Sequence, residues 1–317
     1  MSDAAPHDAA FREREASLLF ADLRGFSAIT GAYPAYVVLG VLSRCFGELA
    51  DLVVRHGGTV DKLLGDGIMA VFYGDGGASD HARRAAHCAV EMQVAMGELR
   101  QRHRSDELPE VYLGIGISSG TVMTGVIGSD AYRAYTVVGE DVNLASRLEA
   151  LSLRGQVLVS EATYNLCADF VEAADPAEVY VKGRPQAVRI REVLGIPSAD
   201  KRVPRQDLRR SPRVPVELGL QYYLMDGKLV AAGPLAGAVR DLGYHGMLAD
   251  VASPFPVYSE LKLVFDLPFL AFRVTDLYAR TRSIRERGGR YFCGLEFTSL
   301  SAEAEKRIRL FVQMQAQ

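Results

Sequence analysis

A break in composition at residues 196–213 divides the sequence into two parts with different patterns. This segment, IPSADKRVPRQDLRRSPR, holds three prolines, six basic residues and almost no large apolar side chain. Neither helix nor strand periodicity runs through it, which predicts a linker. A chain of 317 residues is long enough for two domains. We expect an N-terminal tail at 1–14, a first domain at 15–196, a linker at 197–208 and a second domain at 209–317.

The first part alternates apolar strand patterns with amphipathic helix patterns. This order predicts an α+β domain, in which a mostly antiparallel sheet is covered by helices. The expected strands lie at 17–20, 59–64, 68–73, 111–118, 121–127, 156–159 and 188–194, and the expected helices at 34–56, 79–103 and 142–152.

The second part contains short strands separated by turn dipeptides, at Asp226-Gly227 and Gly288-Gly289. Apolar and polar residues alternate at 260–265 and 291–297, as they do in strands with one buried face. A closing helix is predicted at 301–314. We expect a small antiparallel barrel with a terminal helix.

Composition excludes several classes of protein. The formal net charge of −3 gives no general basic field, so nonspecific binding to nucleic acid is not expected. The most apolar stretch, 36–54, is interrupted by charged residues, and the N-terminus lacks the apolar core of a signal peptide. The four cysteines lie far apart without a CxxC pair, which predicts reduced thiols and neither a disulfide framework nor a zinc site. We expect a cytoplasmic protein without a membrane span.

Two acidic residues stand where strands end. Asp22 closes an apolar strand in FADLRGFS, and Asp66 lies at the tip of the LGDG hairpin. Carboxylates on adjacent strand ends can share Mg²⁺, which combines one or two carboxylates with phosphate oxygens. The loop after Asp22 enters a helix, and such a helix start suits a phosphate. An Asp-Gly pair on its own is more often only a turn, and both interpretations stay open at this point.

A second candidate group lies in the segment TVVGEDVNLASR. Asn143 and Arg147 are four residues apart, so on a helix they project from the same face. An amide and a guanidinium together can hold a ribose oxygen and a phosphoryl group. A surface helix with an exposed polar face is the alternative interpretation.

Five motifs in order give residues 15–195 a specific resemblance to the catalytic domain of class III nucleotidyl cyclases. They are FADLRGFS, DKLLGDGIMAVF, GIGISSGTVMTGVIG, TVVGEDVNLASR and Val181-Lys182-Gly183. The resemblance implies a ferredoxin-like fold of the βαββαβ type. It also implies that the ribose 3′-hydroxyl of a nucleoside triphosphate attacks the α-phosphorus, releasing pyrophosphate and a 3′,5′-cyclic nucleotide.

The same resemblance implies roles for individual residues. Two Mg²⁺ or Mn²⁺ ions per active site are expected on the acids, with a main-chain carbonyl as a further ligand. The metal ligands are then Asp22, Leu23 and Asp66; Arg147 stabilises the charge on the α-phosphoryl group and Asn143 orients the ribose; Lys182, Gly25 and Phe26 contact the substrate.

The choice of base follows from hydrogen-bond polarity. Lys62 is a pure donor, which suits the N1 acceptor of adenine, and the hydroxyl of Thr136 can accept from the exocyclic amine. Guanylate-forming relatives carry a carboxylate at the Lys62 position. We therefore expect ATP as the substrate and cyclic AMP as the product, with GTP as the alternative.

In this family two catalytic domains assemble each active site. The resemblance places Asp22 and Asp66 on one subunit and the base-selecting and phosphate-binding residues on the other. This chain holds both sets, so we expect a head-to-tail homodimer with equivalent sites. The sequence departs from some relatives at 112–114, where an additional phosphate-binding arginine is missing.

Residues 205–317 are similar to a PilZ domain, a small barrel that binds cyclic di-GMP. The motifs are Arg209-x-x-x-Arg213, Asp241-Leu242-Gly243-Tyr244-His245-Gly246 and a late strand at 291–297. The resemblance implies that Arg209, Arg210 and Arg213 meet the phosphates and guanine acceptors, while Asp241, Gly243 and Gly246 form the rest of the site. Gly243 stands where the family usually has serine, which removes one hydrogen bond and weakens or abolishes binding.

The sequence thus predicts a homodimeric adenylate cyclase that is regulated by cyclic di-GMP. The arginines of the second motif lie at the linker, so ligand binding there can change how the domains are arranged. Three alternatives stay open: a guanylate cyclase, an inactive dimeric scaffold that senses cyclic di-GMP, and a PilZ fold that acts only in dimerisation.

Overall fold

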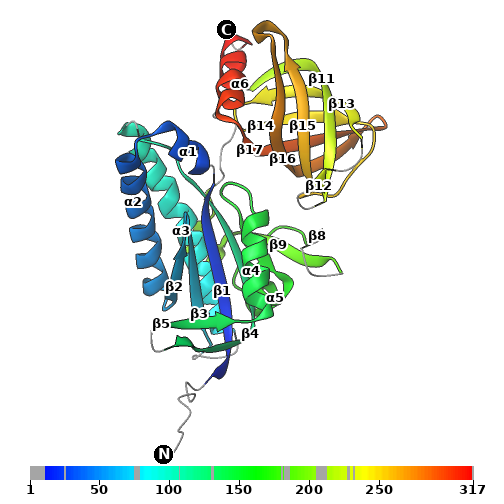
Figure 1. Ribbon diagram of the computed structural model, residues 1–317. Helices are drawn as coiled ribbons and strands as arrows, with labels where there is room; N and C mark the ends of the chain where they lie inside the picture. Colours follow the sequence, from blue (N-terminus) through cyan, green and yellow to red (C-terminus); the bar gives the residue numbers. More distant parts are fainter. Residues whose placement is uncertain are drawn as a thin grey trace, which may run out of the picture. The chain divides into compact units, whose positions relative to one another are not determined.

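The computed structural model describes residues 11–24, 26–74, 79–106, 108–129, 132–179, 181, 186–204, 213–226, 229–230 and 233–315. Contacts divide the chain into two compact units (Figure 1). The first holds the described residues before 25 and those from 35 to 204, and the second holds those from 25 to 34 and those beyond 205. Each unit is described by itself.

The centre of the first unit is an antiparallel sheet in the spatial order β4-β1-β3-β2 (Figure 1). Along the chain the order is β1-α2-β2-β3-α3-β4, which is the predicted βαββαβ arrangement of a ferredoxin-like domain. The elements are β1 (Arg12–Arg24), α2 (Ala35–Arg55), β2 (Thr59–Leu64), β3 (Gly67–Tyr73), α3 (Asp80–Ser105) and β4 (Tyr112–Ser129).

Further strands and helices extend this sheet beyond β4. Strand β6 runs parallel to β4, β9 pairs with β6, and β5 pairs with the far end of β4. These elements are β5 (Tyr132–Val138), α4 (Glu140–Leu151), β6 (Val157–Ser160), α5 (Glu161–Cys167), β7 (Glu172–Ala173), β8 (Ala177–Val179) and β9 (Val188–Ile196).

The structure corrects three expectations for the first unit. The strand expected at 17–20 is a longer one, β1, because its polar first residues pair with the outer part of β4. The two strands expected at 111–118 and 121–127 are one continuous strand, and β5 was not predicted. The beginning of the predicted linker is ordered: η1 (Pro197–Ala199) leads to β10 (Lys201–Arg202), which pairs with β9.

Strand β4 is continuous because its glycines serve helix packing and not a turn. Gly114, Gly116, Ser118 and Gly120 alternate along the strand and so share one face. A Cβ on Gly116 would lie 2.0 Å from the backbone nitrogen of Glu149, and one on Gly120 would lie 2.1 Å from Asp141 Oδ2. The backbone of α4 therefore lies directly against Gly116, and the side chain of Asp141 occupies the space beside Gly120. We call Gly114, Gly116 and Gly120 the glycine strip.

The second unit contains an antiparallel sheet that closes on itself. The strand order is β11-β13-β14-β17-β16-β15, and β15 pairs back to β11, which confirms the predicted barrel (Figure 1). The elements are β11 (Arg213–Asp226), β12 (Leu229–Val230), β13 (Leu235–Gly243), β14 (Gly246–Val251), β15 (Glu260–Leu267), η3 (Pro268–Leu270), β16 (Phe272–Arg287), β17 (Arg290–Leu300) and α6 (Ala302–Gln315), and α1 (Phe26–Ala32) groups with this unit.

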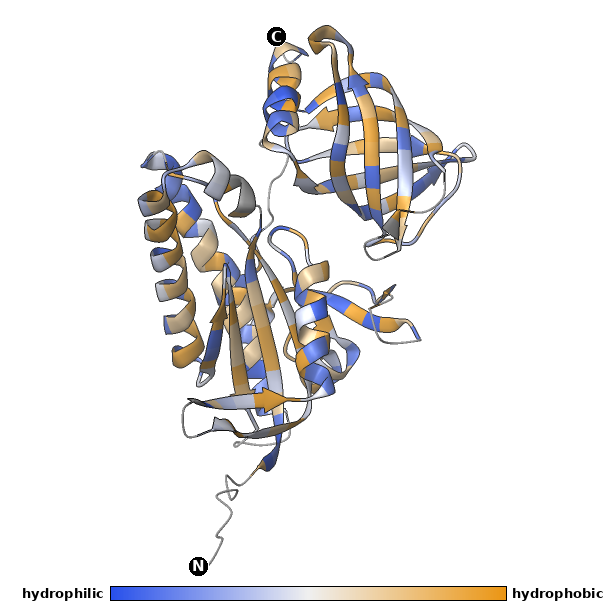
Figure 2. Cartoon of the chain, viewed as in Figure 1, coloured by the Kyte–Doolittle hydropathy of each residue, from blue (hydrophilic) through white to orange (hydrophobic). Residues whose placement is uncertain are grey.

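Two local signals in the second unit are confirmed. Gly288 and Gly289 have φ values of 61° and 73°, as the two-residue turn between β16 and β17 requires. Ser301 caps α6 by accepting a hydrogen bond from the Ala304 nitrogen at 3.2 Å. Hydrophobic and hydrophilic residues alternate along the barrel strands (Figure 2), and Ile308 and Phe311 of α6 are buried in the same core.

The structure bears on two expectations, that the cysteines are reduced and that no segment spans a membrane. All four cysteines are unbonded and buried, as predicted for reduced thiols. Across the ranges that the structure describes, no helix combines the length and the apolar character needed to cross a bilayer.

We predict that Gly116→Ala destabilises the first unit by at least about 2 kcal/mol, because the added methyl group meets the backbone of α4. Gly47→Ala is the matched control. Gly47 lies on the exposed face of α2 with nothing within 4 Å of its Cβ position, so this change should raise stability by about 0.5–1 kcal/mol. Urea unfolding measures both values, and equal stability of the two variants would contradict the packing argument.

Candidate functional site

The structure brings the two predicted acids together. Asp22 near the end of β1 is paired with Gly67, the first residue of β3, and the backbone nitrogen of Leu23 donates to the carbonyl of Asp66 at 3.2 Å. A Cβ on Gly67 would lie 2.8 Å from Asp22 Oδ1, so the glycine makes room for this carboxylate. The positive φ of 67° at Gly65 turns the hairpin so that Asp66 reaches the end of β1.

The surroundings of Asp22 disfavour its negative charge. Burial, followed by the nearby charges of Glu149 and Asp66, raises the pKa of Asp22 to about 7, while Arg24 opposes the shift. The carboxyls of Asp22 and Asp66 also interact by a hydrogen bond. Closely spaced oxygen ligands that repel one another are suited to a divalent cation, which would relieve the repulsion.

Arg24 links this acid to α4 and was not predicted as a site residue. It donates to Asp22 Oδ2 at 3.2 Å and to the carbonyl and hydroxyl oxygens of Ser152 at 3.1 and 2.9 Å. It also forms an ion pair of 2.6 Å with Glu149 Oε1. The sequence signal that could have identified Arg24 is its position two residues after Asp22, which places both side chains on the same face of the strand. The guanidinium therefore ties the end of β1 to the C-terminal end of α4.

Helix α4 presents Asn143 and Arg147 one turn apart, as predicted. Asn143 is exposed and Arg147 is half-buried, and neither side chain has a hydrogen bond or ion pair within the described ranges. The helix is fixed beneath them: Ser118 donates to Asp141 Oδ1 at 2.5 Å, and Gly116 meets the helix backbone. Two donor side chains are thus held in place with their polar groups unused.

The other predicted substrate residues are more scattered. Lys62 lies on β2, is exposed, and has its ammonium 3.0 Å from Asp61 Oδ2. Thr136 is half-buried on β5, opposite Gly125 of β4. Phe26 begins α1. The predictions for Gly25 and Lys182 concern positions outside the described residues.

The candidate ligand site of the second unit lies at the hairpin of β13 and β14. Arg213 donates to Asp241 Oδ1 at 2.8 Å, and the same oxygen accepts from the Leu248 nitrogen at 3.1 Å. The predictions for Arg209 and Arg210 concern positions outside the described residues. The structure therefore brings one predicted arginine to the predicted aspartate.

The two glycines of this motif are explained by different close contacts. A Cβ on Gly246 would lie 2.4 Å from the carbonyl oxygen of Leu295 on β17, so the strand pairing requires glycine there. A Cβ on Gly243 would lie 2.8 Å from Arg213 Cγ. The missing side chain at Gly243 therefore leaves the space that the Arg213 side chain occupies.

Comparison with known families agrees with both halves of this description. The model of the adenylate and guanylate cyclase catalytic domain matches residues 9–192, and that of the PilZ domain matches residues 207–313. The chain belongs to the adenylate and guanylate cyclase catalytic domain family and carries a C-terminal PilZ domain.

Two adenylate cyclases that are similar to this chain match part of its length. Adenylate cyclase 1 of Rhizobium meliloti is 31% identical over 190 residues, which are 59% of this chain and 28% of that protein. An adenylate cyclase of Anabaena cylindrica is 33% identical over 189 residues, 57% of this chain and 37% of that protein. The chain thus spans about a third of the length of these curated relatives.

Solved structures of both cyclase types are similar to the chain. The adenylyl cyclase CyaB from P. aeruginosa has a TM-score of 0.56 and 32% identity, covering 58% of this chain and 95% of that one. The guanylyl cyclase Cya2 has a TM-score of 0.57 and 36% identity, covering 61% of this chain and 98% of that one. Overall similarity therefore does not distinguish ATP from GTP.

We predict that Arg24→Ala lowers the free energy of unfolding by about 2 kcal/mol, because it removes several charge-assisted hydrogen bonds between β1 and α4. Arg83→Ala is the control, since Arg83 forms an exposed ion pair with Asp169 and a long contact of 5.8 Å with the Phe170 ring, and its loss should change stability by less than about 1 kcal/mol. Denaturant unfolding compares the two, and an equally small effect of Arg24→Ala would contradict the linking role.

Proposed function

We propose that this protein is an adenylate cyclase that converts ATP to 3′,5′-cyclic AMP and pyrophosphate. The observation that carries the proposal is the pairing of Asp22 and Asp66 at adjacent strand ends, tied through Arg24 to the helix that presents Asn143 and Arg147. We also propose the domain limits of 15–196 for catalysis and 209–317 for sensing.

The acids fit a divalent metal. Their ligand atoms are carboxylate oxygens, and the crowding that raises the pKa of Asp22 is what a bound cation would relieve. Asp22, Asp66 and the Leu23 carbonyl would hold two Mg²⁺ or Mn²⁺ ions, which supply an activated ribose hydroxyl and a neutralised triphosphate.

The remaining steps are assigned to side chains of the chain itself. Arg147 offers a guanidinium fork to the charge that develops on the α-phosphoryl group, where a fixed donor contributes about 3–4 kcal/mol in the transition state. Asn143 orients the ribose so that its 3′-oxygen lies in line with the leaving pyrophosphate. The triphosphate is also contacted by Lys182 and by the loop after Asp22, through Gly25 and Phe26.

A homodimer is supported by an exposed apolar group on β4 and β5. Monomeric proteins seldom expose large contiguous apolar patches, and such patches mark interfaces. A second copy burying this surface is consistent with acids from one subunit facing the donors of the other. The exposed residues that share one face of this strand pair are Met123, Ile127 and Val138.

We predict that Asp66→Asn and Arg147→Ala each abolish turnover alone and that mixing them restores it. In a shared-site dimer, a mixed pair holds one intact site, so up to about half of the mixed dimers' possible sites regain activity. Release of pyrophosphate from ATP measures this. Parent activity without any recovery on mixing would overturn the shared site, whereas a parent that never cyclises any nucleoside triphosphate would indicate the scaffold alternative.

The preference for ATP depends on Lys62. Its ammonium carries only donors, and adenine presents an acceptor at N1 where guanine presents a donor. The exposed position of Lys62 on β2 leaves it accessible to a base, although Asp61 competes for its charge at 3.0 Å.

We predict that Lys62→Glu moves the preference towards GTP by at least about tenfold in the ratio of kcat/KM values, equivalent to about 1.4 kcal/mol. Identification of the cyclic product from equimolar ATP and GTP checks this, and Lys262→Glu on the barrel strand β15 is a charge-matched control. A parent enzyme that makes cyclic GMP would support the guanylate cyclase alternative.

We further propose that the second unit binds cyclic di-GMP and that binding changes cyclase activity. Arg213 and Asp241 already form an ion pair, so the ligand must replace this contact with its own phosphate and guanine groups. Arg209 and Arg210, next to the linker, would then close over the ligand and alter the arrangement of the two domains.

We predict that Arg213→Ala weakens cyclic di-GMP binding by at least about tenfold, because a charge-assisted contact is worth about 1.5–3 kcal/mol. Arg273→Ala, elsewhere on the barrel, is the control. Calorimetric titration measures affinity, and parallel cyclase assays measure regulation. No binding by the parent protein would leave dimerisation as the role of this domain.

A further inference from the structure

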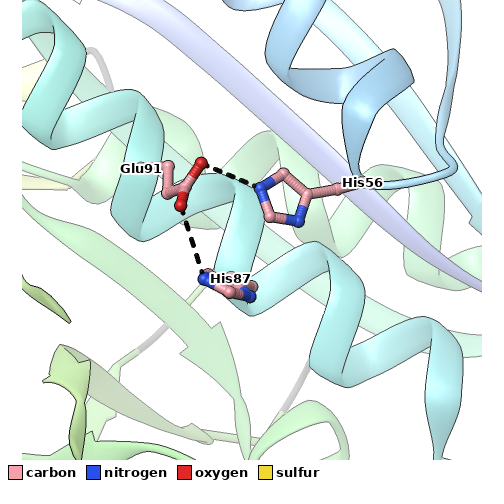
Figure 3. Close-up of side chains that lie close together, drawn as sticks. All are labelled: His56, His87 and Glu91. Carbon is pink, nitrogen blue, oxygen red and sulfur yellow. Dashed lines mark hydrogen bonds and ion pairs between the residues drawn. The ribbon is translucent and has the colours of Figure 1, made fainter. Parts of the chain in front are cut away.

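Two histidines and a glutamate converge on the helical side of the first unit, apart from the strand ends that carry Asp22 and Asp66. His56 follows the end of α2, and His87 and Glu91 lie four residues apart on one face of α3. Figure 3 shows that the two carboxylate oxygens of Glu91 contact the two imidazole rings, one each. Their ligand atoms all lie within 4.8 Å of one another.

From this arrangement we infer a transition-metal site formed by His56, His87 and Glu91, which binds Zn²⁺ or a similar borderline ion. Imidazole and carboxylate ligands suit Zn²⁺, Co²⁺ and Ni²⁺, whereas Mg²⁺ prefers an all-oxygen set. Three protein ligands with an open fourth position are a common arrangement for zinc.

The distances are close to what such an ion requires. Zinc bonds of about 2.0–2.1 Å in a tetrahedron place neighbouring ligand atoms about 3.4 Å apart. His56 Nε2 lies 3.1 Å from Glu91 Oε2, and His87 Nε2 lies 3.5 Å from Glu91 Oε1. The two imidazole rings lie close together, with their centroids 4.6 Å apart.

One of these three ligand atoms, on His87, makes no hydrogen bond within the described ranges. His87 Nε2 is shielded from solvent and, within the described ranges, has no hydrogen-bond partner, since its contact with Glu91 is not aligned as a hydrogen bond. A buried polar atom without a partner is costly, and a metal ion would satisfy it.

Two cations compete for the same carboxylate. Lys201 Nζ on β10 lies 3.6 Å from Glu91 Oε1, and Arg55 lies 4.0 Å from Glu91 Oε2. Both have flexible, partly exposed side chains that can move away when a metal binds. If a metal ion binds here, Lys201 competes with it for the Glu91 carboxylate, so removing Lys201 should tighten metal binding. A network of ion pairs without a metal site would show no such effect, which makes this the sharpest test.

The test uses the full, tag-free chain with Asp22→Asn, so that the acids of the proposed active site do not contribute a second metal site. Co²⁺ is titrated while its visible d–d absorption is recorded, and Zn²⁺ is then used to displace it. We expect one Co²⁺ per chain, with a spectrum of a four- or five-coordinate site containing nitrogen ligands. If the Asp22→Asn protein gives no such spectrum, the proposed metal site is wrong.

Two variants separate the metal site from a structural role. His87→Gln should weaken Co²⁺ binding by at least about tenfold, while His245→Gln in the second unit should leave it unchanged. Lys201→Gln should tighten binding about 2- to 5-fold, because an opposing cation is removed. Unchanged affinity in His87→Gln, or in Lys201→Gln, overturns the assignment. The result does not depend on cyclase activity, so it stands or falls apart from the proposed function.

Discussion

The close approach of α4 to the backbone of β4 is the constraint on which the rest of the first unit depends. A helix can lie this near a strand only where side chains are absent, and the glycine strip provides that surface. The helix backbone is then fixed against the sheet at both ends, by Asp141 near its start and by Arg24 near its end. Rotation or sliding of α4 would break both contacts at once.

This packing joins two groups of residues that the sequence separates by more than a hundred positions. Asp22 lies at the end of β1, and Asn143 and Arg147 lie on α4, yet Arg24 bonds to both elements. The same neighbourhood gathers negative charge, because Glu149 and Asp66 both face Asp22. The position of α4 therefore sets the electrostatic environment of the acid as well as the position of the donors.

Much of the fold was predictable from local signals. The helical stripe of α2, the hairpin of β2 and β3, and the Gly288-Gly289 turn each follow from periodicity or turn chemistry. The short alternating strands of the second part predicted the barrel, and the family resemblance implied the ferredoxin-like fold. The glycines of β4 misled the prediction because glycine marks a turn as often as a close contact, and only the tertiary partner distinguishes the two. The unpredicted β5 has alternation too weak to stand out from its flanks.

The candidate site shows the same division between what local sequence predicts and what only tertiary structure reveals. Asp22, Asp66, Asn143 and Arg147 were found because each lies in a recognisable motif, whereas Arg24 acts through contacts with Glu149 and Ser152 that no short pattern encodes.

The cluster of His56, His87 and Glu91 was missed for a related reason. Its members come from just after the end of α2 and from the middle of α3, and no short sequence pattern links His56 to the other two residues. Glu91 shows why the local pattern was uninformative: a helical glutamate four residues after a histidine is ordinary until a second histidine packs beside it.

The proposed ligand-binding side chains of the two units differ in whether they already have a partner within the protein. In the first unit, Arg147 and Asn143 have no partners within the described ranges, so a ligand meets donors that give up no protein contact. In the second, Arg213 is already paired with Asp241, so a ligand gains only the difference between its own contacts and that ion pair. Under the proposed function, this asymmetry favours a catalytic site that binds its substrate whenever it is present. The proposed sensing site, in contrast, would have to exchange an existing ion pair for contacts with its ligand.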